Sequence, residues 1–319
     1  MQSYIAKRTL LFIPTVIMVT VLVFIVMRLI PGDPALLLLA GESGEGTFTH
    51  EQLAKLRATL GTDRPLYVQY GAWVWDMVRL DFGTSAFYNT PITDDLAAKF
   101  PITLELTILA VLLATVIAVP LGVLSAIKQD TWTDYVARII SIAGVALPTF
   151  WVGILIVYFL VRLFGWLPPL GYVNLWEDPA TNLQQLIFPA IALAFFNMAF
   201  IARVTRSSML EVFREDYIRT ARSKGLTERV VISRHALKNA LMPVVTVSGY
   251  EFGRLIAGTV VIESIFLVPG VGRLLIDSIF HRDYTMIQAI IVVIILVVLV
   301  LNLAIDVIYA WLNPRIRYT

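Results

Sequence analysis

Two ionisable residues, Glu251 and Arg254, lie three positions apart in the mostly apolar stretch Val244–Phe266. On an α-helix this spacing places the two side chains close enough to pair. Ionisable groups within an apolar helix are costly to place in lipid, so they mark ion pairs, substrate pathways or gates. The pair therefore predicts either a structural ion pair to a neighbouring helix or a part of a transport pathway or its gate. The sequence leaves both roles open.

Residues suited to metal binding or catalysis are few. The chain has no cysteine, and its three histidines, His50, His235 and His281, lie far apart in the sequence. We therefore expect neither a thiolate nor a histidine metal site. A phosphate-binding loop needs the pattern G-x-x-x-x-G-K-[ST], and no glycine here is followed by lysine. The sequence predicts no catalytic residue, no metal and no cofactor bound by this chain.

The elements that carry these residues are expected to be membrane helices. Hydrophobic residues make up 58% of the chain and charged residues only 15%, whereas a soluble domain has about 25% charged residues. Six stretches approach the roughly 20 apolar residues that a helix needs to cross a bilayer. They are Thr9–Ile30, Ile102–Ala126, Ile139–Leu163, Leu186–Ala202, Val244–Phe266 and Ile287–Trp311. Their continuous apolar character predicts an all-helical membrane protein and excludes the alternating pattern of a membrane β-barrel.

The distribution of lysine and arginine predicts the orientation of these helices, because basic residues accumulate on the cytoplasmic side. Placing Lys7 and Arg8 there puts four distant basic residues and one long basic segment on the same side. The four are Lys128, Arg138, Arg315 and Arg317, and the segment contains Arg203, Arg206, Arg214, Arg219, Arg222, Lys224, Arg229, Arg234 and Lys238. We therefore expect both ends in the cytoplasm. The first stretch exceeds the apolar core of a signal peptide, about 7–15 residues, and is expected to be retained.

Residues 31–101 are expected to form the one long extracytoplasmic segment. A helix capped by Thr49 or His50, with leucines at helical spacing, is predicted near its middle and ends at Gly61. Aromatic residues typical of a membrane surface follow, at Tyr67, Tyr70, Trp73 and Trp75. The segment is predicted to be a lid on the helices, a docking surface for a soluble partner, or both.

The basic segment predicts a folded cytoplasmic insert between the fourth and fifth stretches. Glu211–Lys224 has the periodicity of a helix, and Gly225 is placed to take the left-handed conformation that ends it. Thr227 can cap a second helix, and Pro243 marks the entry to the fifth stretch. The ordinary excess of positive charge on the cytoplasmic side of a membrane would need only two or three lysine or arginine residues. We therefore expect two short basic helices, joined at a glycine corner, that contact a partner.

This insert resembles the cytoplasmic coupling motif of ABC-importer permeases. The similarity lies in Asp216–Leu226 and Arg234–Pro243, and it is greatest to the dipeptide/oligopeptide/nickel family, in particular to its B-type dipeptide permeases. Further family marks run along nearly the whole chain, at Pro31–Pro34, Leu60–Leu66, Asp81–Ser85, Pro269–Arg273 and Asn313–Arg317. The general importer pattern has an acidic residue and two alanines before the glycine and an earlier proline. This chain has Arg219, Thr220 and Ala221 there, which alters the acidic contact but not the glycine corner.

The resemblance implies a permease similar to those of type I ABC importers, with about six transmembrane helices and both ends in the cytoplasm. It also implies three parts: an N-terminal transmembrane helix at residues 1–30, the extracytoplasmic segment at 31–101, and a five-helix permease core at 102–319 with the coupling loop at 204–243. ATPase contact would fall to Asp216, Tyr217, Arg219, Ala221, Arg222, Lys224 and Gly225. The implied partners are a second homologous permease, two cytoplasmic ATPase subunits that hold ATP and magnesium, and an extracytoplasmic substrate-binding protein, in the inner membrane of a prokaryote.

The expected function is uptake of di- or oligopeptides, driven by ATP hydrolysis on the partner subunits. The same family also handles glutathione, nickel chelates and oligosaccharides, and these substrates stay open as alternatives. A secondary transporter or channel would instead carry ionisable pairs in several stretches and would lack paired basic helices in one loop. This sequence has neither of these two features. No nucleic-acid partner is expected.

Overall fold

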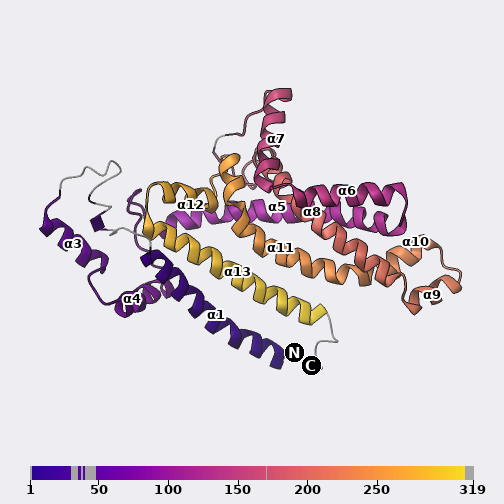
Figure 1. Ribbon diagram of the computed structural model, residues 1–319, viewed down its shortest axis with the longest axis horizontal. Helices are drawn as coiled ribbons and strands as arrows, with labels where there is room; N and C mark the ends of the chain where they lie inside the picture. The colour runs from indigo at the N-terminus through magenta and orange to yellow at the C-terminus, as the bar shows by residue number, and fades with distance from the viewer. Residues whose placement is uncertain (1, 30–34, 37–38, 40–47, 170, 313–319) are drawn as a thin grey trace. The chain divides into compact units, whose positions relative to one another are not determined.

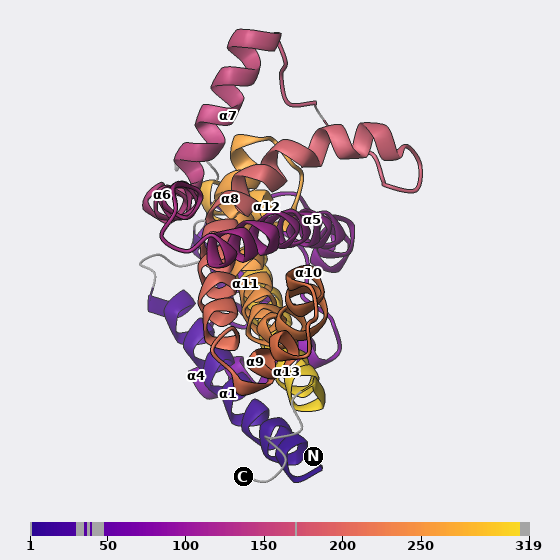
Figure 2. The same cartoon turned by 90° about the vertical axis from the view of Figure 1, so that its right-hand side faces the viewer.

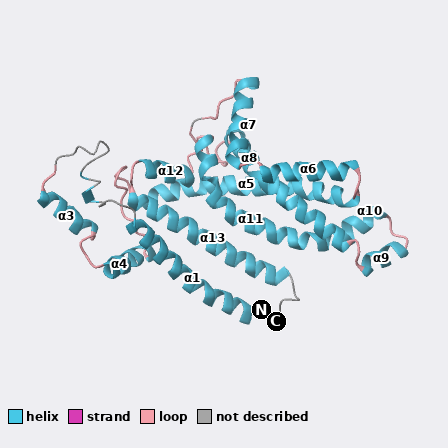
Figure 3. Ribbon diagram, viewed as in Figure 1, coloured by secondary structure: helices cyan, strands magenta, loops and turns pink. Residues whose placement is uncertain are grey.

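The computed structural model describes residues 2–29, 35–36, 39, 48–169 and 171–312, and this part of the chain is helical with no β-strand (Figure 3). It divides into two compact units. Unit 1 contains Ile102–Pro269 and the chain from Leu301 onward, and unit 2 contains Gln2–Pro101 and Gly270–Val300. Each unit is therefore built from segments that are distant in the sequence.

Unit 1 is a bundle organised around one long helix, α8. Its elements are most of α5 (Ile92–Ile127), α6 (Trp132–Ala146), α7 (Thr149–Phe164), α8 (Pro179–Val212), α9 (Asp216–Ser223), α10 (Glu228–Val230), the π-helix η1 (Val231–Ala236), α11 (Leu237–Ile265) and the end of α13 (Tyr284–Leu312). Helices α6, α7 and α11 all contact α8, and α11 also contacts α7 (Figures 1 and 2). This central position makes α8 the element that connects the rest of the unit.

Small residues allow the helices of unit 1 to approach closely. A Cβ atom added to Gly144 of α6 would lie 2.7 Å from the Cβ of Ala199 on α8, and one on Gly122 of α5 would lie 2.6 Å from the carbonyl oxygen of Ala202. Only glycine fits at these two contacts. Close backbone approach of this kind is typical of helix packing in membranes, where apolar side chains gain little by leaving lipid.

The third predicted stretch, Ile139–Leu163, is not one straight helix. It is divided between α6 and α7, whose axes are bent by 103° (Figure 2). The break falls at Leu147, which has extended φ and ψ of −89° and 127°, directly before Pro148. Proline disfavours the helical conformation of the residue before it and donates no backbone hydrogen bond. Pro120 and Pro189, by contrast, lie within α5 and α8 without ending them.

Four helices of the described chain are long and apolar enough to cross a membrane, namely α1, α5, α8 and α13, and a fifth span results if α6 and α7 count as one bent span. The fifth predicted stretch is a continuous helix, α11, but its charged and hydroxyl residues lower its apolar character. The class, an all-helical membrane protein, is confirmed. The number of six spans stays a prediction.

Unit 2 contains α1 (Gln2–Leu29), α3 (His50–Leu60), α4 (Leu66–Val78), the start of α5, α12 (Val271–Phe280) and the start of α13. Its core brings Val23 of α1 and Met77 of α4 together with Ile287 and Val292 of α13. The predicted cap of α3 is confirmed as a capping box, in which Thr49 and Gln52 exchange hydrogen bonds, and Gly61 ends the helix with a φ of 65°. The local sequence signals for this helix were therefore sufficient.

Candidate functional site

The cytoplasmic insert predicted from the sequence begins differently from expectation. Glu211–Lys224 is not one helix, because α8 continues to Val212 and α9 starts only at Asp216. A turn at Phe213–Glu215 separates the two helices. The turn accompanies burial, since Ile218 and Ala221 of α9 both lie in the core.

Helix α9 is anchored by its inner face and displays its outer face. Ile218 and Ala221 pack with Met209 of α8, with Val231 and Ala236 of η1, and with Ala126 and Ala240 at the ends of α5 and α11. On the outer face, Asp216 and Arg219 are exposed and form a 3.3 Å ion pair. The exposed Tyr217 accepts a hydrogen bond on its hydroxyl from the side chain of Asn239, at 2.8 Å. Of the predicted contact residues, Ala221 is therefore a core residue, whereas the others lie at the surface.

The glycine corner has the geometry that the sequence predicts. Gly225 has a φ of +78°, in the left-handed region, and follows the exposed Lys224 at the end of α9. Across this corner Arg222 donates to Glu228, with the atoms 2.6 Å apart. The hydrogen bond from Arg222 holds the pKa of the Glu228 carboxyl below its ordinary value. Both side chains are about half exposed, so solvent screening limits the contribution of the pair to less than about 1 kcal/mol.

A second short helix, predicted to follow Thr227 and to end before Pro243, does not exist as a separate element. The chain runs from α10 through η1 into α11 without a break, and Pro243 lies inside α11. Six residues, Val231–Ala236, form the π-helix at this junction. Such π-helical turns are rare and recur at functional sites. The insert is thus one helix, α9, attached at a glycine corner to the extended start of α11.

A buried carboxylate that the sequence reasoning missed lies near this insert. Asp134 of α6 is fully buried and accepts hydrogen bonds from Arg206 of α8, with both distances 2.9 Å, and from Arg138 of α6, at 2.7 Å. Ser125 and the backbone N–H of Asp130 also donate to it. The i, i+4 spacing of Asp134 and Arg138 was visible in the sequence, but Arg206 is 72 positions from Asp134.

The predicted pair in the fifth stretch forms. Glu251 and Arg254 are 2.7 Å apart, with 10% of the Glu251 side chain exposed and 54% of that of Arg254. The Arg254 guanidinium also reaches α8, where it lies 3.4 Å from Asn197 Oδ1 and 4.5 Å from the ring centre of Phe196. The pair therefore connects α11 to α8. A second acid of α11, Glu263, was not singled out from the sequence; it is fully buried and accepts a hydrogen bond from Thr103 of α5, at 2.7 Å.

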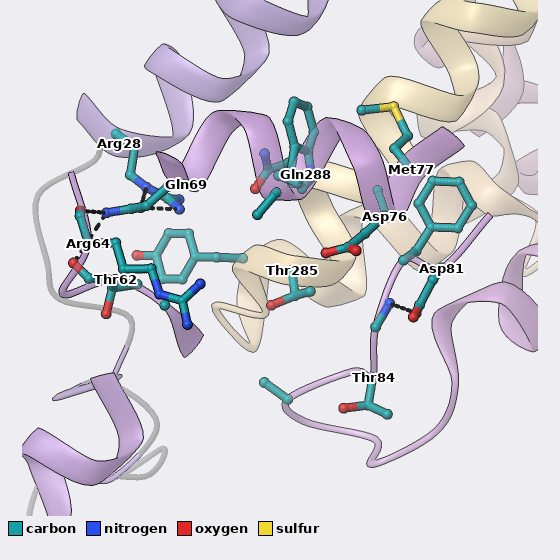
Figure 4. A pocket seen from close by; sticks show the side chains of 18 of the residues that line it. Arg28, Thr62, Arg64, Gln69, Asp76, Met77, Asp81, Thr84, Thr285 and Gln288 are labelled. Carbon is teal, nitrogen blue, oxygen red and sulfur yellow. Dashed lines mark hydrogen bonds between the residues drawn. The ribbon is translucent and has the colours of Figure 1, made fainter. Parts of the chain in front are cut away.

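Unit 2 has a cavity of about 450 Å³ between α4 and the start of α13. Figure 4 shows Arg28 paired with Gln69 on one side of it, Asp76 and Asp81 on the other, and Gln288 between them. The Nε2 atom of Gln288 has no hydrogen-bond partner among the described residues. Because the charged side chains of this cavity are exposed, they indicate no particular ligand. In the described part of the chain, no cluster of histidine, aspartate and glutamate has the arrangement of metal ligands.

Comparison with known protein families gives two matches that together cover nearly the whole chain. Residues 118–318 match the family described as binding-protein-dependent transport system inner membrane component, and residues 1–107 match the N-terminal family of such membrane components. Among curated proteins, the dipeptide transport system permease protein DppB of Alkalihalophilus pseudofirmus is 39% identical over the full length of both chains. The glutathione transport system permease protein GsiC of Salmonella choleraesuis is also 39% identical, again over both full lengths.

A solved structure of low sequence similarity shares the fold. An inward-facing structure of the MetNI methionine ABC transporter matches 70% of this chain and 98% of its own chain, with a TM-score of 0.58 and 17% identity. At this identity the match concerns the fold alone. It agrees with the all-helical class predicted from composition.

Proposed function

The chain belongs to the family of binding-protein-dependent transport system inner membrane components, as a multi-pass permease subunit of an ABC importer, and we propose that its substrates are di- and oligopeptides. The full-length relatives support this substrate class, since one is named for dipeptides and the other for glutathione, which is itself a tripeptide with a γ linkage. Glutathione is therefore the second candidate. Nickel chelates and oligosaccharides, which the sequence left open, have no comparable support among these relatives.

The proposed complex contains a second homologous permease, two cytoplasmic ATPase subunits and an extracytoplasmic substrate-binding protein. In this arrangement ATP and magnesium are held by the ATPase subunits, and the present chain contributes no catalytic residue. The absence of the G-x-x-x-x-G-K-[ST] pattern from the sequence supports this division of roles. The permease chains would provide the pathway through the membrane.

The observation that carries the proposed contact with the ATPase subunits is the surface formed by α9 and its glycine corner. Its inner residues, Ile218 and Ala221, are fixed in the core, while Asp216, Tyr217 and Arg219 are exposed on a helix of eight residues. A short amphipathic helix of this kind fits a groove on a partner. We place Asp216, Tyr217, Arg219, Arg222, Lys224 and Gly225 at the ATPase contact, with Ala221 as an anchor beneath it.

Both ends of the chain are proposed to lie in the cytoplasm, with residues 31–101 outside. The natural chain has no cysteine, so single cysteines can be labelled without background. In sealed cells, a membrane-impermeant maleimide should label Trp176→Cys, a position 91% exposed between α7 and α8. Ser223→Cys on α9 should react only after the cells are opened. Labelling of Ser223→Cys from outside would reverse the proposed orientation.

The proposed function is tested by purifying the chain with the subunits that accompany it and reconstituting the complex in proteoliposomes. Uptake of a radiolabelled dipeptide should require both ATP on the cytoplasmic side and the binding protein on the other. Uptake driven by an ion gradient without ATP would instead indicate a secondary transporter. Competition by unlabelled glutathione that exceeds competition by dipeptides would favour the second substrate class.

A further inference from the structure

The Asp134 carboxylate joins three helices at one point. It lies on α6, receives Ser125 from the end of α5, and receives Arg206 from α8. The two hydrogen bonds from Arg206 arrive from different nitrogen atoms, Nε and Nη2, so they fix the orientation of the guanidinium as well as its distance. A buried carboxylate held in this way resists displacement, because separation of α6 from α8 would break both of its charge-assisted hydrogen bonds to Arg206.

Two arginines bind the same carboxylate but differ in what they connect. Arg138 is on α6 itself, one turn from Asp134, so its ion pair stays within one helix. Arg206 is on α8, so its ion pair is the one that links α6 to another helix. The two distances are similar, 2.7 and 2.9 Å. The chain therefore offers two contacts of one carboxylate to compare, one within a helix and one between helices. Arg138 differs from Arg206 in that it also forms an ion pair with the exposed Asp130, at 3.3 Å.

Helix α8 leads from this contact directly to the exposed coupling helix. Arg206 precedes the end of α8 at Val212 by less than two turns. Met209, between Arg206 and Val212, belongs to the same buried cluster as Ile218 of α9. Arg206 also lines a surface groove of about 500 Å³ that continues through Arg214 to Asp216, the first residue of α9. The last turns of α8, this buried cluster and this groove therefore lie between Arg206 and α9.

We propose that Asp134 is a positioning residue that ties α6 to the coupling segment through Arg206, so that a displacement of α9 by the ATPase is passed to α6. This inference rests on the proposed role of α9 in ATPase contact. It assigns to the inter-helix ion pair the task of linking ATP hydrolysis to the membrane helices. The pair within α6, Asp134 with Arg138, has no part in that task.

The test compares Arg206→Gln with Arg138→Gln in the complete reconstituted complex. Each variant removes one cation from the same carboxylate, so each should lower thermal stability. The discriminating measurement is the number of dipeptides transported per ATP hydrolysed. Arg206→Gln should lower this ratio about tenfold while the ATPase subunits remain attached, and Arg138→Gln should keep it within about twofold of the natural chain.

Equal ratios in the two variants would overturn the proposal and leave Asp134 as a stabilising residue only. If Arg206→Gln does not assemble, Arg206→Lys is measured in the same way, because lysine keeps the charge but cannot donate from two fixed positions. An unchanged number of dipeptides transported per ATP in Arg206→Lys would then overturn the proposal. A natural complex without ATP-dependent uptake would contradict the proposed function itself, which is a different outcome from equal ratios in the variants.

Discussion

The Gly225→Val substitution is expected to lower retention of the ATPase subunits about tenfold or more while the chain still inserts into the membrane. Gly225 has a φ of +78°, and no atom lies within 4 Å of the position that a Cβ would occupy. The expected effect is therefore conformational and not a steric clash with a neighbour. A residue with a Cβ loses about 1–2 kcal/mol in the left-handed region, and more if it is β-branched. The corner would relax into another conformation and displace α9.

Retention is measured by purifying the tagged permease and quantifying the ATPase subunits that come with it. The matched control is Gly61→Val, because Gly61 also ends a helix with a positive φ, +65°, and has no neighbour within 4 Å. Gly61 lies in the segment proposed to be extracytoplasmic. Gly61→Val should therefore cause similar local strain without loss of the ATPase subunits. Gly225→Asn should retain more ATPase than Gly225→Val, since asparagine tolerates the left-handed region. Normal retention in Gly225→Val would remove the corner from the contact.

The features predicted correctly from the sequence are those decided by neighbouring residues. The capping box at Thr49 and Gln52 and the left-handed glycine at 225 depend on a few positions each, and both are present. The pairing of Glu251 with Arg254 is likewise local, because the two residues are less than one turn apart. Apolar stretches of about 20 residues predicted the four helices α1, α5, α8 and α13, which are long and apolar enough to cross a membrane.

The features missed are those decided by residues that are distant in the sequence. Nothing between Val212 and Asp216 is a glycine or proline, so these positions gave no local signal for the break between α8 and α9. After the break, Ile218 is buried in one cluster with Met209 and Val231. Pro148 was visible, but the 103° angle between α6 and α7 depends on how each packs against α8. Arg206 looked like one more cytoplasmic charge, and its pairing with Asp134 needed the fold.

The second large effect concerns Glu251 and Arg254, whose single substitutions are expected to lower the free energy of unfolding by unequal amounts. Glu251 is mostly buried, whereas about half of the Arg254 side chain is exposed in the isolated chain. Arg254→Met should therefore leave a mostly buried carboxylate without its cation, a loss of about 1–3 kcal/mol because the arginine is half exposed. Glu251→Gln should be milder, because the arginine keeps its contacts with Asn197 and Phe196. Thermal unfolding of the two purified variants compares these costs.

The double variant Glu251→Gln with Arg254→Met decides between the two roles that the sequence left open. Removing both charges leaves no buried ion, so the stability lost in Arg254→Met should largely return. If the pair is structural, dipeptide uptake in proteoliposomes should return with it. We propose that the pair lies at the pathway or its gate, because the half-exposed guanidinium lies beside an aromatic ring and an amide of α8. The double variant should then assemble, hydrolyse ATP and transport at least about tenfold more slowly, and full uptake would assign the pair to packing alone.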